Sequence, residues 1–472
     1  MAENFASLLD SAARRTPDKV ALVWDGGSLA WGELDRRAGG FARSLAERGV
    51  RAGDRIALLM GNRWPLIVAL WGGLKLGATV VPLNPLLAED ERSRVVAHLR
   101  PTLVVDAVGD EEAEWASVPS TDSPALILYT SGSTGQPKGA VLSHAALTFS
   151  TRSWADAVMA LGPEDRVLAV LPFSHSYGLN GALFAPLSAG ATVVLLERFS
   201  PEDVLAAIVR QRVTVFPGVA TMFRRLLDSP QLESADLSSL RLALSGAAPC
   251  PWDLAEEWRA RTSVRILRGY GMTELFRPIS YLAGDVTDLP DAIGRAVPGV
   301  SVRAMDDDGR PVPAGDVGEL WIKSPAALDG YLDDPAETRA VLEDGWFKTG
   351  DLVHISPDGY VRIAGRKREL ILRGGYSVFP AEVEAALLTH PAVAEAAAVG
   401  VAHAELGEDV VAFVTLHVGR TATPAQLIAH GKERLAAYKY PRRIVIVDQL
   451  PKGPTGKILK SRLTTPGTGE TS

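Results

Sequence analysis

The sequence predicts an α/β protein with a large N-terminal domain of packed αβ layers and a small α+β C-terminal domain. Short Val-, Ile- and Leu-rich runs alternate with amphipathic segments between Trp31 and Arg268, which is typical of buried sheets covered by helices. From about Val300 the pattern changes to strands separated by turns, and after Gly365 it changes again. The length of 472 residues suggests about three domains.

In the N-terminal part, the most apolar stretch is Pro65–Leu83, but several glycines and Lys75 interrupt it, so it predicts a buried helix and a strand instead of a membrane span. The expected strands are Arg55–Met60, Ala78–Pro82, Thr102–Asp106, Ala125–Tyr129, Arg166–Pro172, Thr192–Glu197, Val213–Pro217, Arg241–Ser245 and Ser263–Arg268. The expected helices are Trp31–Arg48, Pro201–Arg212, Ala220–Asp228 and Pro251–Arg261.

The C-terminal third divides into two patterns. Turn sequences such as Asp307-Asp308-Gly309 predict a β-rich subdomain at about 300–365. We place the N-terminal domain at 1–367 and a mobile C-terminal domain at 368–472, with a frayed tail from Thr464. The latter should contain helices Phe379–Thr389 and Pro424–Ala437 and strands Val393–Gly400, Val410–His417 and Ile444–Val447.

Composition restricts the classes of function. The chain is 47% hydrophobic and 22% charged, which argues against disorder, and its net charge of −7 gives no global attraction to nucleic acid. The single cysteine, Cys250, excludes an intrachain disulfide, and the flanking prolines supply no base to activate it. The start, Met1–Arg15, lacks the pattern of a signal peptide. We therefore expect a cytoplasmic protein without a membrane span or a nucleic-acid partner.

The strongest local feature is the run Tyr129–Gly139, YTSGSTGQPKG, between two strand-like segments. Small residues let backbone N–H groups approach an anion, and hydroxyls and Lys138 add donors and charge, which suits a triphosphate. The spacing is not that of G-x-x-x-x-G-K-[ST], and no helix is expected to follow. Taken alone, the run also fits a flexible turn with a solvated lysine.

The run is the first of six ordered blocks that together resemble the adenylate-forming superfamily of acyl- and aryl-CoA synthetases, carrier-loading adenylation domains and firefly-type luciferases. The chain looks most similar to a bacterial acyl-CoA synthetase. The other blocks are Pro172–Gly178, Gly269–Glu274, Gly345–Asp351, Gly365–Arg368 with Gly374–Tyr376, and Pro451–Lys457.

The resemblance implies an AMP-forming acid–thiol ligase that uses ATP and Mg²⁺ and transfers the acyl group to coenzyme A. No carrier-like segment with a modifiable serine is found, which favours free CoA. Three other reactions stay open: loading of a separate carrier protein, activation of another oxyanion, and transfer to an amine acceptor. A catalytically inactive nucleotide-binding protein is the alternative of another class. A luciferase-like oxygenase would require a specialised acid pocket that the sequence does not disclose. The sequence specifies neither the acid nor the oligomeric state.

The resemblance also implies roles for individual residues in binding ATP. Glu274, together with Thr134, would ligate Mg²⁺, because hard cations prefer oxygen ligands. Asp351 would accept hydrogen bonds from the ribose hydroxyls, and Arg366 would contact ribose and phosphate. The phosphates would lie on Thr130, Ser131, Gly132, Ser133, Thr134, Gly135 and Lys138. The adenine and its surroundings would be lined by Gly246, Ala247, Gly269, Tyr270, Gly271, Met272 and Thr273, with Tyr270 stacking on the base.

Catalysis is expected to depend most on Lys457, which the resemblance places between the carboxylate and the α-phosphate. Lys138, Glu274 and His175 complete the catalytic set, with His175 as a gate at the mouth of the acid pocket. Arg368 occupies the family's hinge position, and Gly374, Gly375 and Tyr376 would face the thiol after domain rotation.

The acid pocket should be lined by His175, Phe216, Val219, Gly246, Gly271 and Arg277. The string Leu275-Phe276-Arg277-Pro278 departs from the commoner small and polar continuation. Arg277 could contact an anionic or polar substituent of the acid, and Arg225 is a second candidate. Both also fit a solvated or ion-paired structural residue, so aliphatic, dicarboxylic and aryl acids remain open.

Overall fold

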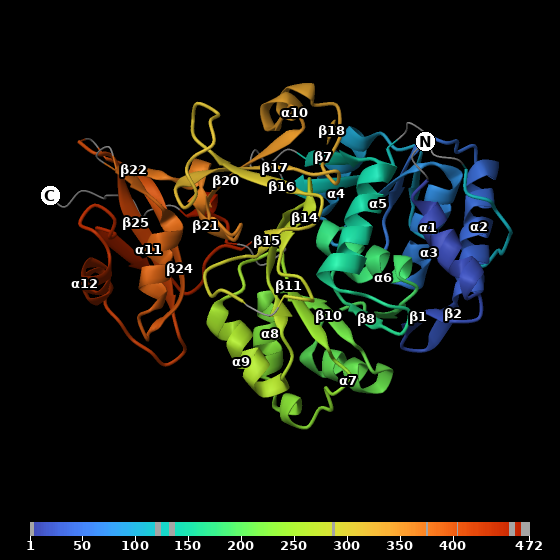
Figure 1. Cartoon of the computed structure of the whole chain (residues 1–472), viewed down its shortest axis with the longest axis horizontal. Coiled ribbons are helices and arrows are strands. Elements are labelled where there is room, and N and C mark those ends of the chain that lie inside the picture. Colours follow the sequence, from blue (N-terminus) through green and yellow to red (C-terminus); the bar gives the residue numbers. More distant parts are fainter. Residues whose placement is uncertain are drawn as a thin grey trace. The chain divides into compact units, whose positions relative to one another are not determined.

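The computed structural model describes residues 4–118, 124–131, 137–285, 288–373, 376–403, 405–452 and 458–463. The chain divides into two compact units, Met1–Val302 with Ile322–Phe347 and Arg303–Trp321 with Lys348–Ser472 (Figure 1). The predicted α/β class is confirmed, because both units combine helices with sheets. The division into compact units does not show whether the C-terminal part moves. The predicted boundary of a mobile domain at Lys367 therefore stays a prediction.

The first unit contains a seven-stranded sheet in the order β12-β11-β10-β8-β9-β1-β2, parallel except for the β1–β2 hairpin. Parallel strands buried on both faces explain why these segments are continuous apolar runs. The strands are β1 (Val20–Trp24), β2 (Gly27–Ala30), β8 (Arg166–Ala169), β9 (Thr192–Leu195), β10 (Val215–Gly218), β11 (Leu242–Ser245) and β12 (Ile266–Leu267).

A six-stranded sheet in the order β18-β7-β6-β4-β3-β5 and the antiparallel sheet β13-β14-β15 complete the strands that position the site in this unit. The bounds in the larger sheet are β3 (Arg55–Leu58), β4 (Thr79–Pro82), β5 (Leu103–Val105), β6 (Leu126–Ser131), β7 (Pro137–Leu142) and β18 (Gly330–Tyr331). Those in the smaller sheet are β13 (Gly269–Met272), β14 (Phe276–Ser280) and β15 (Arg295–Ala296).

Helices cover these sheets, and α1, α2 and α3 pack against one another (Figure 1). The α-helices of this unit are α1 (Ala6–Arg15), α2 (Trp31–Glu47), α3 (Trp64–Leu76), α4 (Glu89–Leu99), α5 (His144–Arg152), α6 (Ala185–Ser188), α7 (Pro201–Gln211), α8 (Ala220–Leu227), α9 (Trp252–Thr262) and α10 (Pro335–Val341). Two π-helical segments, η1 (Ser153–Val158) and η2 (Tyr177–Phe184), and the short 3-10 helix η3 (Pro230–Glu233) accompany them.

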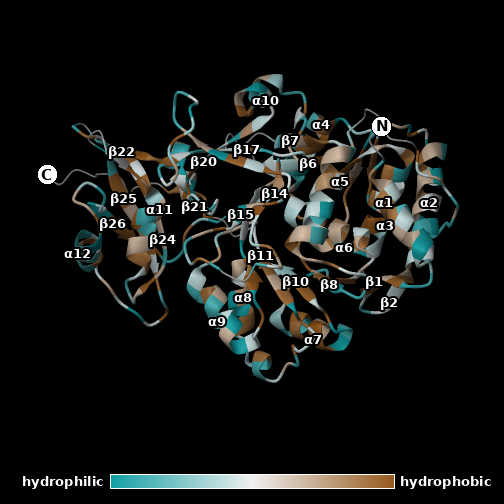
Figure 2. Ribbon diagram, viewed as in Figure 1, coloured by the Kyte–Doolittle hydropathy of each residue, from teal (hydrophilic) through white to brown (hydrophobic). Residues whose placement is uncertain are grey.

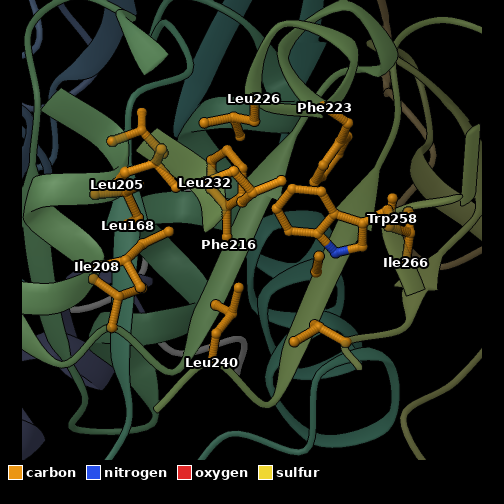
Figure 3. Packing of buried hydrophobic residues seen from close by; sticks show 14 of the residues in the cluster. Leu168, Leu205, Ile208, Phe216, Phe223, Leu226, Leu232, Leu240, Trp258 and Ile266 are labelled. Carbon is orange, nitrogen blue, oxygen red and sulfur yellow. The ribbon is translucent and has the colours of Figure 1, made fainter. Parts of the chain in front are cut away.

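The core beneath α7, α8 and α9 is built around aromatic side chains. Phe216 of β10 lies 5.3 Å from Phe223, which lies 5.1 Å from Trp258, measured between ring centroids (Figure 3). All three are fully buried. Strands β8 and β10 are mostly apolar in Figure 2, whereas α9 carries polar residues on part of its surface. This amphipathic packing fixes the carboxyl ends of β10 and β11, where site residues were expected.

Helix α7 begins at a serine cap that can be tested directly. The hydroxyl oxygen of Ser200 accepts a hydrogen bond from the Asp203 backbone N–H at 3.0 Å, and Pro201 occupies the first turn. We expect Ser200→Ala to lower the free energy of unfolding by about 1 kcal/mol, because one N-terminal donor loses its partner. Urea denaturation measures the change, and Ser200→Thr, which keeps the cap, serves as the control. Equal stability of the Ala variant and wild type would contradict the cap's contribution.

The expected strand Arg166–Pro172 is wrong at its end, because β8 stops at Ala169. The side chain of Asn62 donates to the Leu171 carbonyl oxygen and accepts from the Phe173 N–H at 3.0 Å. These contacts replace sheet pairing after Ala169. The region expected to be β-rich also contains helix α10, whose first turn is capped by Asp334. Helix α12 (Pro424–Arg434) ends before the expected Ala437.

The second unit contains a sheet formed by β22, β23, β24, β25 and β26, in which the long β24–β25 hairpin is central. Val383 and Leu387 of α11 and Leu427 of α12 pack in its apolar core. The elements of this part of the chain are β21 (Val361–Arg366), η4 (Lys367–Glu369), β22 (Ile371–Arg373), β23 (Tyr376–Val378), α11 (Pro380–Leu388), β24 (Val393–His403), β25 (Gly407–Leu416), β26 (Arg443–Ile446) and η5 (Lys460–Arg462). A further sheet joins β16 (Ser301–Met305), β17 (Val317–Lys323), β20 (Trp346–Ile355) and β19 (Leu342–Glu343), of which β19 belongs to the first unit. No helix in the described part of the chain is long and apolar enough to cross a membrane.

Candidate active site

Lys138 projects from the strand that follows the predicted phosphate loop. It lies on β7 opposite Thr130 of β6, in an antiparallel pairing. Its ammonium group is ion-paired with Glu337 of α10 and lies 5.6 Å from the ring centroid of Tyr331. The hairpin therefore holds a cation at the end of the predicted phosphate loop.

Tyr331 connects Lys138 to the predicted metal ligand. Its hydroxyl donates a hydrogen bond to Oε1 of Glu274 at 2.8 Å. Burial, and then the nearby carboxylates led by Glu274, raise the pKa of Tyr331, so the hydroxyl stays protonated and acts as a donor. Glu274, Tyr331, Lys138 and Glu337 form one cluster, which we call the acid–lysine cluster.

The predicted adenine slot is built from backbone that excludes side chains. A Cβ atom at Gly271 would lie 2.0 Å from the Phe276 carbonyl oxygen, and one at Gly246 would lie 3.0 Å from the Tyr177 ring. Ala247 has φ +63°, a left-handed conformation that costs about 1–3 kcal/mol. Such strain is concentrated at ligand sites, which supports a binding role for this turn. Gly269, Tyr270 and Met272 form β13, and Thr273 follows it.

In the second unit, the structure pairs the two residues expected to bind ribose. Asp351 of β20 lies opposite Arg366 of β21, and the distance from Arg366 Nε to Asp351 Oδ1 is 3.0 Å. The Asp351 backbone N–H donates to Oγ1 of Thr349 at 3.0 Å. A buried, oriented carboxylate offers only acceptors, as recognition of two hydroxyl groups requires.

His175 is half-buried, and this partial loss of solvent lowers its pKa, so the imidazole is neutral at pH 7. Two residues further on, the Tyr177 hydroxyl bridges the carboxyl ends of β10 and β11 by hydrogen bonds of 3.0 Å to the Gly218 and Leu244 carbonyl oxygens. Phe216, expected in the acid pocket, points into the core, while Val219 precedes α8 and is half-buried.

The two candidate arginines have different environments. Arg277 is 5% exposed, and its hydrogen-bond acceptors are a hydroxyl and two backbone carbonyl oxygens, so within the described residues it is neither solvated nor ion-paired. Arg225 is exposed on α8 and stacks 5.0 Å from the Phe199 ring centroid. Burial raises the pKa of the Cys250 thiol, which agrees with an unreactive cysteine.

Several predicted residues lie outside the described part of the chain: Gly132, Ser133, Thr134, Gly135, Gly374, Gly375 and Lys457. The side chains of Ser131 and Arg368 are likewise not described. Tyr376 is 58% exposed and stacks on Tyr438 at 4.5 Å between ring centroids. Their roles stay predictions.

Sequence reasoning missed two residues of this cluster: Tyr331, which donates a hydrogen bond to Glu274, and Glu337, which forms an ion pair with Lys138. Asp334-Pro335 is a helix-start signal, and it could have placed Glu337 in the first turn of a helix. Nothing in the local sequence indicates that this turn contacts a hairpin almost two hundred residues earlier.

The chain is similar to known proteins over nearly its whole length. The family model "AMP-binding enzyme" matches residues 9–332, and "AMP-binding enzyme C-terminal domain" matches 382–457. A feruloyl-CoA synthase of Amycolatopsis is 36% identical, with 96% of each chain covered, and an indoleacetate–CoA ligase of Aromatoleum aromaticum is 34% identical with the same coverage. The crystal structure of ATP-bound MatB from Rhodopseudomonas palustris has a TM-score of 0.92 at 32% identity and covers 98% of both chains.

Proposed function

The chain belongs to the AMP-binding enzyme family, and from this premise we propose that it is an AMP-forming acid–CoA ligase. A carboxylate oxygen of an organic acid attacks the α-phosphorus of ATP, the bond to pyrophosphate breaks, and an acyl-adenylate forms. The sulfur of CoA then attacks the acyl carbon, AMP leaves, and a thioester results. Catalysis by alignment and charge stabilisation suits a site without a protein nucleophile.

The observation that carries the proposal is the acid–lysine cluster. It brings the carboxylate of Glu274 to the hydroxyl group and the ammonium of Lys138 to the ring of one tyrosine, Tyr331. A metal–triphosphate substrate requires a metal ligand and a phosphate-binding cation close together, and Tyr331 contacts both. Phosphate oxygens are expected to take over from Glu337 as the partner of Lys138 when ATP binds.

The donor set fits Mg²⁺. Glu274 offers carboxylate oxygens, which this hard cation prefers, and phosphates and water would complete its coordination. Glu274 would hold the ion, with Thr134, and Tyr331 would orient its carboxylate. When bound, Mg²⁺ would neutralise charge on the phosphate oxygens.

The remaining predicted residues complete the two half-reactions. Lys457 would neutralise charge between the carboxylate and the α-phosphate, and neutral His175 would border the acid. For the thiol step, rotation of the C-terminal part about Arg368 would bring Gly374, Gly375 and Tyr376 to the CoA thiol.

The test is a pyrophosphate-release screen with short, dicarboxylic, fatty and aromatic acids, with and without CoA. We expect one class of acid to release pyrophosphate and, with CoA, to give AMP and a CoA thioester. Pyrophosphate release that never yields a thioester would favour a carrier protein or another acceptor. Pyrophosphate release from no acid would refute the proposal.

Asp351→Asn should weaken ATP binding, because an amide cannot accept two hydroxyl hydrogen bonds as a carboxylate does and cannot pair with Arg366. We expect the KM for ATP to rise by about tenfold, the effect of losing a charged hydrogen bond. Steady-state kinetics with ATP and 3′-deoxy-ATP measure the change.

The control for this prediction is Asp308→Asn, which alters an exposed turn of the same unit. Wild type should discriminate against 3′-deoxy-ATP, and Asp351→Asn should discriminate less. An Asp351→Asn variant that discriminates as strongly as wild type would contradict the ribose role.

A further inference from the structure

A small hollow lies beside the predicted nucleotide slot in the first unit. It contains about 180 Å³ of atom-free space, part of which is open to solvent. The hollow therefore has room for no more than a small terminal group of a molecule. Its walls come from α5, η1, β14 and the segments that follow, and include Phe149, Ser153, Trp154, Leu275, Arg277 and Val300.

Among the described residues, no carboxylate pairs with the charge of Arg277. Its N–H groups donate to Ser280 Oγ at 2.9 Å, to the Ser245 carbonyl oxygen at 3.2 Å and to the Leu267 carbonyl oxygen at 3.1 Å. The guanidinium also lies 5.2 Å from the Trp154 ring centroid. None of these partners carries a negative charge, and a buried charge is costly unless an opposite charge accompanies it.

Two further donors in the walls of the hollow lack partners. Within the described residues, the Ser153 hydroxyl and the Trp154 Nε1–H are buried without a hydrogen bond. Buried polar groups are nearly always satisfied, so unpaired ones point to a missing ligand or water. An indole N–H can only donate, which means that the absent group supplies acceptor oxygens.

A second buried arginine, Arg268, can be compared with Arg277 to separate the effect of burial from that of the hollow. Arg268 is also 5% exposed, and it stacks 4.8 Å from the Trp252 ring centroid. Its guanidinium donates to the Leu289 and Pro290 carbonyl oxygens, but it does not line the hollow. The Nε of Arg268 also lacks a hydrogen-bond partner among the described residues. Both arginines are thus buried on an aromatic ring, but of the two only Arg277 lines the hollow that contains Ser153 and Trp154.

Arg277 also packs directly against the expected nucleotide slot. A Cβ atom at Gly269 would lie 2.4 Å from its Nε, and one at Gly246 would lie 3.4 Å from its Nη1. Arg277 follows Glu274 by three residues. An acid whose reacting carboxylate lies at the α-phosphate could therefore extend its other end toward this guanidinium.

We propose that the hollow receives the far end of the acid substrate and that this end carries a second carboxylate, bound by Arg277 with Ser153 and Trp154 as additional donors. The inference rests on the proposed ligase function. Only the first carboxylate is adenylated; the second is unchanged in the thioester.

The test compares each diacid with its half-amide, which has the same shape but a neutral far end. Succinate, glutarate, adipate, isophthalate and terephthalate cover a range of lengths. We expect wild type to prefer the best diacid over its half-amide by about 10- to 100-fold in kcat/KM, the range for a charge-assisted hydrogen bond. Arg277→Met should abolish this preference, and Arg277→Lys should keep part of it.

Arg268→Lys is the matched control, and it should retain the full preference. Ser153→Ala and Trp154→Phe each remove one donor and leave the charge, so they decide the matter even if Arg277→Met fails to fold. Each should lower kcat/KM severalfold for the diacid and little for the half-amide. A diacid preference that is undiminished in both variants would overturn the proposal, as would adenylation of neutral-ended acids alone. In the latter case, the ligase function would stand, whereas pyrophosphate release from no acid would refute that function.

Discussion

Replacing Lys457 by alanine is expected to lower acid-dependent ATP–pyrophosphate exchange by about two to three orders of magnitude, the range for losing one preorganised charge at a reacting centre. The reason is the negative charge shared by the carboxylate and the α-phosphate as the new bond forms. The KM for ATP should change little, because Lys138, Glu274 and Asp351 are proposed to contact other parts of the nucleotide. Lys457 itself lies outside the described residues, so this prediction comes from its motif.

A lysine in the same segment provides the control. Lys452 is ion-paired with Glu395 at 2.6 Å, so Lys452→Ala removes a cation that already has a protein partner. That variant should exchange pyrophosphate at nearly the wild-type rate. Lys457→Ala should still convert a supplied acyl-adenylate to the CoA thioester, because that step follows the loss of pyrophosphate. Near-normal exchange by Lys457→Ala would remove it from the adenylation step.

The fold was most predictable where its strands are buried on both faces. A parallel strand such as Val215–Gly218 has to be apolar along its whole length, so its sequence differs from that of the helices beside it. Prediction failed where a distant side chain decided the outcome. Asn62 satisfies the backbone after Ala169, and this contact ends a strand whose own residues remain apolar.

Site residues that belong to a continuous sequence motif could be predicted. Those that reach the site only through tertiary contacts could not. Lys138 and Glu274 lie in recognisable blocks, but Tyr331 and Glu337 are ordinary residues until the fold brings them together. Arg277 is an intermediate case. Its charge was visible in an unusual string, but its burial beside two unpaired donors depends on η1 packing against β14.

Replacing Glu274 by glutamine should lower Mg²⁺-dependent adenylation by about a hundredfold or more, because an amide oxygen ligates the ion without its negative charge. The Tyr331 hydroxyl can still donate to the amide oxygen, so the contact of 2.8 Å seen with the carboxylate has a neutral counterpart. The defect should therefore lie in metal binding and charge stabilisation and not in folding. Titration of Mg²⁺ at saturating ATP measures it as a higher concentration for half-maximal rate.

Two comparisons separate this loss from a general effect of removing a carboxylate. Glu256→Gln changes an exposed acid on α9, 4.0 Å from Arg259, and should leave the Mg²⁺ titration unchanged. Tyr331→Phe leaves the Glu274 charge in place but removes the hydroxyl that orients it, so it should reduce the rate by about tenfold and respond to added Mg²⁺. If Glu274→Gln kept the wild-type Mg²⁺ dependence while Tyr331→Phe lost activity, the tyrosine would act through Lys138, and the metal ligand would have to be another residue.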